Sequence, residues 1–206
     1  MRTSLLIAFA ASTLMSGSLL AQSTLAAATP TSNAPQANTV NDRRENQQDR
    51  IANGVGSGQL TAGETKNLES REANVNREIK DDRSADGGKL TPAERSQVNK
   101  QQNNLSKSIY ADKHNVAQQN YKGEVGERQR NQQQRIAQGI KSGQMTAGEA
   151  AKTENHEQGI NQQVQADRAA NGGKLTGGEK QQINKEQNGA SRQIYREKHN
   201  GSVQPK

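Results

Sequence analysis

Residues 88–94 read GKLTPAE, and this stretch recurs with small changes along the chain. The other copies are GQLTAGE at 58–64, GQMTAGE at 143–149 and GKLTGGE at 173–179. Each copy has a threonine followed three residues later by a glutamate, the pattern of a capping box. The threonine oxygen accepts a hydrogen bond from a free N–H of the first helical turn, and the glutamate places negative charge at the positive end of the helix dipole. The stretches therefore predict four helix starts, with caps at Thr61, Thr91, Thr146 and Thr176.

The chain also repeats itself over a longer distance. RIANGVGSGQLTAGE at 50–64 aligns with RIAQGIKSGQMTAGE at 135–149, and the same alignment continues to the end of both copies without a gap. Within each copy, apolar residues recur in steps of seven and four after each capping stretch, which places them on one face of a helix. No stretch alternates with a period of two, so we expect no sheet. The predicted fold is all-α, with two tandem copies of a small three-helix unit.

The segments on either side of the repeats have different compositions. Arg2 is followed by an apolar run and then by small residues, the pattern of a signal peptide cleaved after Ala21 or after Ala28. We expect a signal peptide at 1–21, a flexible and disordered linker at 22–41, helical repeats at 42–118 and 127–201, a linker at 119–126 and a tail at 202–206. The expected location is the periplasm or the cell exterior.

The composition limits the size of the core. Apolar residues make up 29% of the chain and aromatic residues 2%, and there is no cysteine or tryptophan. Little apolar area is then available to offset the conformational entropy of folding. We expect a marginal core and a tendency to self-associate. The formal net charge of +7 favours weak attraction to anionic surface polymers, whereas the lack of stacking aromatic residues argues against specific nucleic-acid binding.

The repeated stretch also resembles the second half of an EF-hand calcium loop, in which glycine turns the chain and the last glutamate binds the metal with both oxygens. In the consensus register no copy has an acid at the first ligand position. A loop one residue longer does align suitable side chains in two copies. The candidate metal ligands are Asp82, Asp86, Glu94, Asp167, Asn171 and Glu179. Calcium is therefore an alternative interpretation of a motif that helix capping also explains.

No catalytic constellation is evident in the sequence. We find no nucleophile paired with a base and no phosphate-cradling loop, and we expect no enzyme activity and no cofactor other than calcium. His114 and His199 occupy equivalent positions in the two copies, where a charged residue near a helix C-terminus is the simplest role.

The long repeats resemble those of a group of uncharacterised exported bacterial helical-repeat proteins that carry R-I-x-x-G-x-x-S-G-x-L-T-x-x-E. This resemblance implies helices and export. The LT-x-x-E helix starts are similar to the LTxxQ repeats of periplasmic chaperones of the Spy/CpxP type, and the hydrophilic, glycine-rich composition resembles that of hydrophilins, which protect other proteins under water stress.

These features together favour a non-enzymatic exported protein that is stress-protective or chaperone-like and works through polar amphipathic helices. The alternative is a calcium-binding module with degenerate EF-hand-like loops. The expected partners are unfolded client proteins or anionic surface polymers, with no membrane span.

Overall fold

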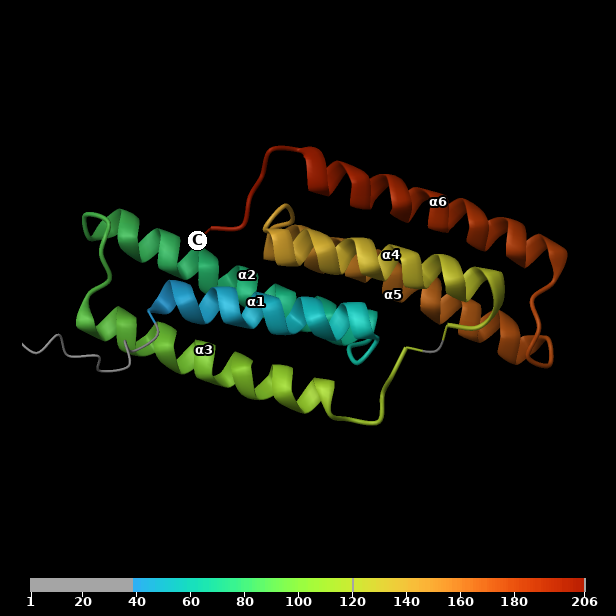
Figure 1. Cartoon of the computed structure of the whole chain (residues 1–206), viewed down its shortest axis with the longest axis horizontal. Helices are drawn as coiled ribbons and strands as arrows, with labels where there is room; N and C mark the ends of the chain where they lie inside the picture. Colours follow the sequence, from blue (N-terminus) through green and yellow to red (C-terminus); the bar gives the residue numbers. More distant parts are fainter. Residues whose placement is uncertain (1–38, 120, 206) are drawn as a thin grey trace, which may run out of the picture. The chain divides into compact units, whose positions relative to one another are not determined.

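The computed structural model describes residues 39–119 and 121–205, and within these ranges it contains helices and no strand. The helices are α1 (Val40–Ser57), α2 (Ala62–Ala85), α3 (Pro92–Lys113), α4 (Gly123–Ser142), α5 (Ala147–Ala170) and α6 (Gly177–His199) (Figure 1). The prediction of an all-α fold is confirmed. The expected signal peptide at 1–21 and residues 22–38 of the expected linker lie outside the described residues.

All four predicted capping boxes are present. The Thr61 backbone N–H donates to Glu64 Oε2 at 2.8 Å, and the Glu64 N–H donates to Thr61 Oγ1 at 3.3 Å. The same reciprocal pair of bonds begins α3, α5 and α6. A fifth box, between Thr39 and Asp42, begins α1 and was not predicted.

Two helices are longer than the sequence pattern suggests. α1 begins at Val40, inside the segment expected to be a flexible linker, and α4 begins at Gly123, inside the linker expected at 119–126. Val40 and Val125 are buried near these helix starts, so each first turn contributes to a core. The Thr39–Asp42 box gives α1 a further reason to begin there. Residues 40–41 and 123–126 are therefore helical.

The two repeats pack against each other through equivalent helices. Within each repeat the three helices contact one another, and between repeats α1 packs on α4 and α2 packs on α5. The paired helices run in opposite directions (Figure 1). Each helix therefore meets its own counterpart, which is the arrangement of an isologous two-fold interface built within one chain.

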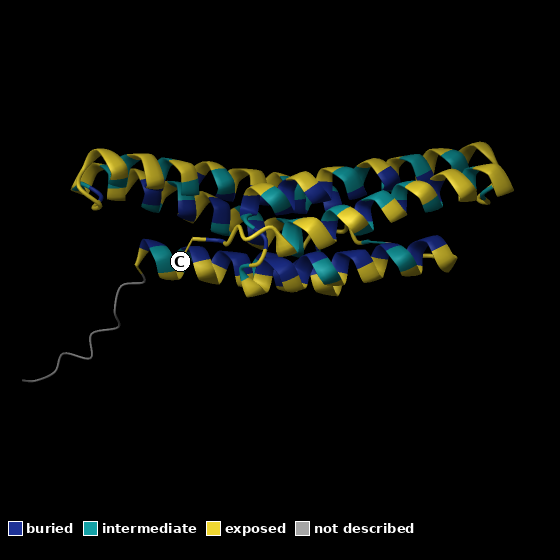
Figure 2. Ribbon diagram, turned by 90° about the horizontal axis from the view of Figure 1, so that it is seen from above, coloured by how far each residue is buried: buried dark blue, intermediate teal, exposed yellow. Residues whose placement is uncertain are grey.

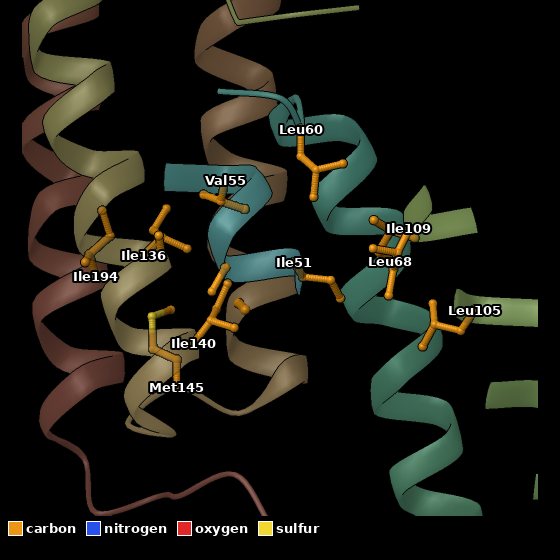
Figure 3. Close-up of a cluster of buried hydrophobic side chains, with 13 residues drawn as sticks. Ile51, Val55, Leu60, Leu68, Leu105, Ile109, Ile136, Ile140, Met145 and Ile194 are labelled. Atoms are coloured by element: carbon orange, nitrogen blue, oxygen red, sulfur yellow. The ribbon is translucent and has the colours of Figure 1, made fainter. Parts of the chain in front are cut away.

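The apolar core follows this pseudo-symmetry. Its central part takes side chains from both repeats, and Figure 3 draws them as sticks and labels the larger ones. The members of this shared core are Ile51, Ala52, Val55, Leu60, Leu68, Leu105, Ile109, Ile136, Ala137, Ile140, Met145, Ala150 and Ile194. Two smaller clusters, one per repeat, lie beyond it, around Val98 and around Ile183. Buried positions face the spaces between helices, while exposed positions face outward (Figure 2).

Glutamine side chains supply much of the remaining contact between helices. In the first repeat the Gln47 side-chain amide on α1 donates to the Gln102 backbone carbonyl at 2.6 Å. The Gln102 side-chain amide on α3 donates to the Val40 backbone carbonyl at 2.8 Å. Gln132 and Gln187 make the equivalent bonds in the second repeat. The side-chain N–H groups of these glutamines are thus paired, whereas their side-chain oxygens accept no hydrogen bond from a described residue. The glutamines that make the sequence so hydrophilic are thus partly interior residues.

Close packing at one glycine leads to a prediction. A Cβ on Gly54 would lie 2.7 Å from both Cγ and Cδ1 of the fully buried Leu60, whereas a Cβ on the equivalent Gly139 would meet the flexible side chain of Met145. We expect Gly54→Ala to lower the free energy of unfolding by about 1–2 kcal/mol, because overpacking outweighs the gain in helix propensity. Gly159→Ala, with no atom within 4 Å of its Cβ, should instead raise it. Urea unfolding of both variants checks the opposite signs, and stabilisation by both would contradict this packing.

Candidate functional site

Four fully buried glutamates lie on α2 and α5, the helices that pack against each other between the repeats. Glu69 and Glu72 come from α2, Glu154 and Glu157 come from α5, and each is 0% exposed. We refer to these four residues as the glutamate cluster. Their spacing of three residues places each pair on one helix face, the face that also carries the apolar stripe. The two pairs occupy equivalent positions in the two copies of the repeat, so the cluster has the pseudo-symmetry of the fold.

Few hydrogen-bond donors reach these carboxyls. The Gln48 amide on α1 donates to Glu69 Oε2 at 3.1 Å, and the Gln133 amide on α4 donates to Glu154 Oε2 at 2.9 Å. Neither carboxyl oxygen of Glu72 or Glu157 accepts a hydrogen bond from a described residue. An ionised carboxylate only accepts hydrogen bonds, whereas a protonated one also donates. A site rich in acceptors and poor in donors therefore favours the protonated form.

Burial shifts the titration of all four groups in the same direction. Burial raises the pKa of Glu69 to about 8. The hydrogen bond from Gln48 lowers this pKa, and the charge of Glu72 raises it further. Burial also raises the pKa of Glu72 to about 7 and that of Glu157 to about 8. The pKa of Glu154 is raised by burial and further by the charges of Glu157 and Glu69. Transfer of a carboxylate from water to an apolar interior disfavours its charged form, which is the common cause.

Only part of the cluster charge meets an opposite charge. Arg44 on α1, itself buried, lowers the pKa of Glu72, and Arg135 on α4 lowers that of Glu157. Glu69 and Glu154 have amide partners rather than cations. Burial is the main cause of a raised pKa at the Tyr121 hydroxyl, and the nearby charges of Glu154 and Glu157 add to this rise. Full ionisation would therefore place four negative charges against two guanidinium groups.

This arrangement can couple proton binding to the contact between repeats. When the glutamates are neutral, the interface buries polar but uncharged groups. When they ionise, like charges lie on both sides of the α2–α5 contact, where desolvation penalises each one. Separation of the two helices would rehydrate the carboxylates and relieve that penalty.

The first predicted metal loop does bring its acids near one another. The pKa of Asp86 is raised, mainly by a hydrogen bond to Glu94. The pKa of Asp82 is raised mainly by desolvation, and the charge of Glu94 adds to this rise. Glu94 also accepts the Thr91 backbone N–H in the capping box, which lowers its own pKa. One carboxyl oxygen of this candidate ligand is thus already used by the helix cap.

The second predicted loop is arranged differently. The Asn171 amide donates to Glu179 Oε1 at 2.7 Å and to the Asp167 backbone carbonyl at 2.9 Å. Asn171 therefore presents its nitrogen, not its oxygen, to the glutamate. Within residues 39–119 and 121–205, no group of three or more His, Asp or Glu side chains has an arrangement that would hold a metal ion. Calcium binding by these loops stays a prediction.

The sequence pattern alone did not reveal the glutamate cluster. Glutamate side chains usually lie in solvent, so the apolar periodicity alone does not predict their burial. One signal was present: Glu69 and Glu72 fall beside Leu68 and Val75 in the apolar stripe and recur unchanged in the second copy, although Leu68 itself is replaced there by Thr153.

No described helix is both long enough and apolar enough to cross a membrane. No protein-family model, curated protein or solved structure matches this chain.

Proposed function

We propose that this chain is an exported, non-enzymatic, stress-protective protein that holds unfolded client proteins when its glutamate cluster ionises. The observation that carries the proposal is the burial of four carboxyls on α2 and α5, of which Glu69 and Glu154 act on each other across the contact between the two repeats. That contact covers an apolar core to which both repeats contribute. A change in the charge of the cluster therefore acts on the contact that keeps this apolar surface out of water.

The chemistry of the core suits a binding surface of this kind. Its members are mainly aliphatic, and Ile51, Ile136 and Ile140 sit on the α1 and α4 faces that meet between repeats. Exposed aliphatic surface of several hundred Å² is typical of sites that bind other proteins. The outer faces of the helices are polar: among the described residues the large apolar side chains that are exposed are Tyr110 and Tyr195 on helices, and Val116 and Val203 in the segments after α3 and α6. Client binding thus requires the repeats to separate.

The test measures aggregation of an unfolded client at two pH values. The protein is expected to suppress aggregation at about pH 8.5, where the cluster is charged, and to be much less effective at about pH 5.5, where it is neutral. Several clients should be used so that their own pH dependence is averaged out.

A variant with all four glutamates of the cluster changed to glutamine provides the comparison. It keeps the shape of the interface without the charge and is expected to be inactive at both pH values. A matched control neutralises four exposed acids, Glu45, Asp49, Asp81 and Glu127, and should behave like the unchanged protein. Equal suppression by the glutamine variant and the control at high pH would refute the proposal.

A further inference from the structure

A pocket of about 470 Å³ lies where the start of α1, the end of α2 and the start of α3 meet. Four cationic side chains line it: Arg43, Arg83, Lys89 and Arg95. No Asp or Glu is among its lining residues. Thr39 and Val40 at the start of α1 also line it, and the Asp42 carboxylate of the capping box lies in the same turn. We refer to this as the first end pocket.

An equivalent pocket of about 310 Å³ occurs in the second repeat. Its cations are Lys122, Arg168, Lys174 and Lys180, and Glu124 is its single acidic lining residue. It lies where α4 begins, and α4 has no side-chain cap to occupy its first N–H groups. This second end pocket and the first lie at opposite ends of the six-helix unit (Figure 1).

No cation of the two pockets forms an ion pair with a described acid. The ion pair found within the described residues, Lys152 with Glu197, involves neither pocket. Arg83 donates to the Asn41 side-chain oxygen and Arg168 to the Lys122 backbone carbonyl, both uncharged acceptors. The first end pocket therefore gathers four cations with no carboxylate among its lining residues.

The duplication shows which cations the two copies share. Arg83, Lys89 and Arg95 correspond to Arg168, Lys174 and Lys180, so each position has kept a positive charge. The four other positions on α2 that have Lys or Arg in the first copy have no Lys or Arg in the second copy. Lys66, Arg71, Arg77 and Lys80 correspond to Ala151, His156, Gln162 and Gln165. Three cationic positions at the pockets are thus cationic in both copies, whereas the other cationic positions of α2 have Lys or Arg only in the first copy.

The first end pocket continues into a groove along the outer side of α3. The groove shares Leu90, Arg95 and Asn99 with the pocket and extends past Lys100 to Lys107. Both lysines have cationic counterparts, Lys185 and Arg192, on α6. Cations spaced along a helix suit a ligand that carries several negative charges in a line better than a single small anion.

We propose that the two end pockets are binding sites for the sulfate or phosphate groups of a linear polyanion. Guanidinium groups bind tetrahedral oxyanions through paired N–H donors, and lysines add charge of less defined geometry. The amides of Asn99 and Asn184 line the pockets and supply further donors. This proposal is independent of client binding and of the glutamate cluster.

The experiment compares two variants that lose the same charge from different places. The pocket variant changes Arg83, Arg95, Arg168 and Lys180 to glutamine. The control variant changes Lys66, Arg71, Arg77 and Lys80 to glutamine. Binding of heparin, which carries sulfates, and of inorganic polyphosphate is measured by titration calorimetry at several salt concentrations around 0.15 M. Circular dichroism verifies that both variants remain helical.

The pocket variant is expected to bind at least about tenfold more weakly than the control and to show a shallower dependence of binding on salt, because fewer counterions are released. Preference for heparin would identify sulfate as the ligand group, and preference for polyphosphate would identify phosphate. Equal weakening of the two variants would overturn the proposal, since net charge alone would then explain binding. If the pocket variant loses helix content, Arg95→Gln with Lys180→Gln replaces it, because both side chains are exposed and make no hydrogen bond to a described residue.

Discussion

The free energy of unfolding is expected to fall as the pH rises from about 4.5 to about 8. In the unfolded chain the cluster glutamates titrate near their ordinary pKa of 4.5, whereas in the folded chain burial raises the pKa of Glu69 and Glu157 to about 8. Between these values the folded state binds more protons than the unfolded state, so each increase in pH removes stability. Below 4.5 the stability linked to the cluster is fully present, and above about 8 it is lost.

The expected size of this effect is large for a protein of this length. Each unit by which burial raises a pKa corresponds to roughly a tenfold change in the folding equilibrium. Plain addition of these shifts would exceed the stability of a typical domain, roughly 5–15 kcal/mol, but water reaching the charged carboxylates limits the combined loss, which we expect to be on the order of several kcal/mol. The midpoint of thermal unfolding should fall by about 10 °C or more across this range.

Other carboxyls act in the opposite direction at low pH. A backbone N–H bond in the capping boxes lowers the pKa of Asp42, Glu94 and Glu179. The stability from these groups is present above their unfolded pKa and is lost as the pH falls through their lower folded pKa. The free energy of unfolding should therefore be greatest at about pH 5 and decline at both lower and higher pH.

Urea unfolding across the pH range, with glutamine in place of all four cluster glutamates, separates the two effects. The glutamine variant should lose the decline between about pH 5 and 8 and be more stable than the unchanged protein at the upper end. The control with Glu45, Asp49, Asp81 and Glu127 neutralised should keep the decline. A profile that rises from pH 5 to 8 in the unchanged protein would contradict buried, neutral glutamates.

Each repeat expressed alone is expected to form a homodimer. Residues 39–119 would expose the half of the shared core that α4 and α5 cover in the full chain. Because α1 packs on its counterpart α4, and α2 on α5, a second copy of the same repeat presents an equivalent surface. Folding should then depend on concentration, with a loss of about 1.4 kcal/mol of apparent stability for each tenfold dilution.

The second repeat provides an internal comparison for this prediction. Thr153 and Ala190 stand where the first repeat has Leu68 and Leu105, so the second repeat buries less apolar surface. Residues 123–205 alone should be less stable than residues 39–119 at equal concentration. Sedimentation analysis and thermal melts at two concentrations measure both effects. A stable monomer with a melting temperature that does not change with concentration would be inconsistent with a core shared between repeats.

The helices were predictable because their signals are local. A threonine and a glutamate three residues apart satisfy N–H groups within one turn, so Thr61, Thr91, Thr146 and Thr176 identify helix starts without any tertiary information. The apolar residues in steps of seven and four identify the buried face in the same way, and of these residues Leu60, Val98 and Ile183 are fully buried.

The glutamate cluster was not predictable by the same rules, because its burial depends on a contact between helices of different repeats, which are far apart in the sequence. Its place beside Leu68 and its recurrence as Glu154 set Glu69 apart from the exposed Glu45, but its burial depends on α5 packing against α2. The start of α1 was missed for a simpler reason: the Thr39–Asp42 box uses aspartate instead of glutamate at the end of a segment rich in Ala, Thr and Ser.

The most direct test is a carbon-13 NMR titration of the glutamate side-chain carboxyls in the full chain. Four resonances, identified by their absence from single Glu→Gln variants, should titrate well above the rest, with the carboxyls of Glu69 and Glu157 near pH 8 and that of Glu72 near pH 7. Titration of every glutamate near its ordinary pKa of 4.5 while the protein remains folded would show that these carboxyls are in contact with water, and the proposed coupling between protons and the repeat interface would be wrong.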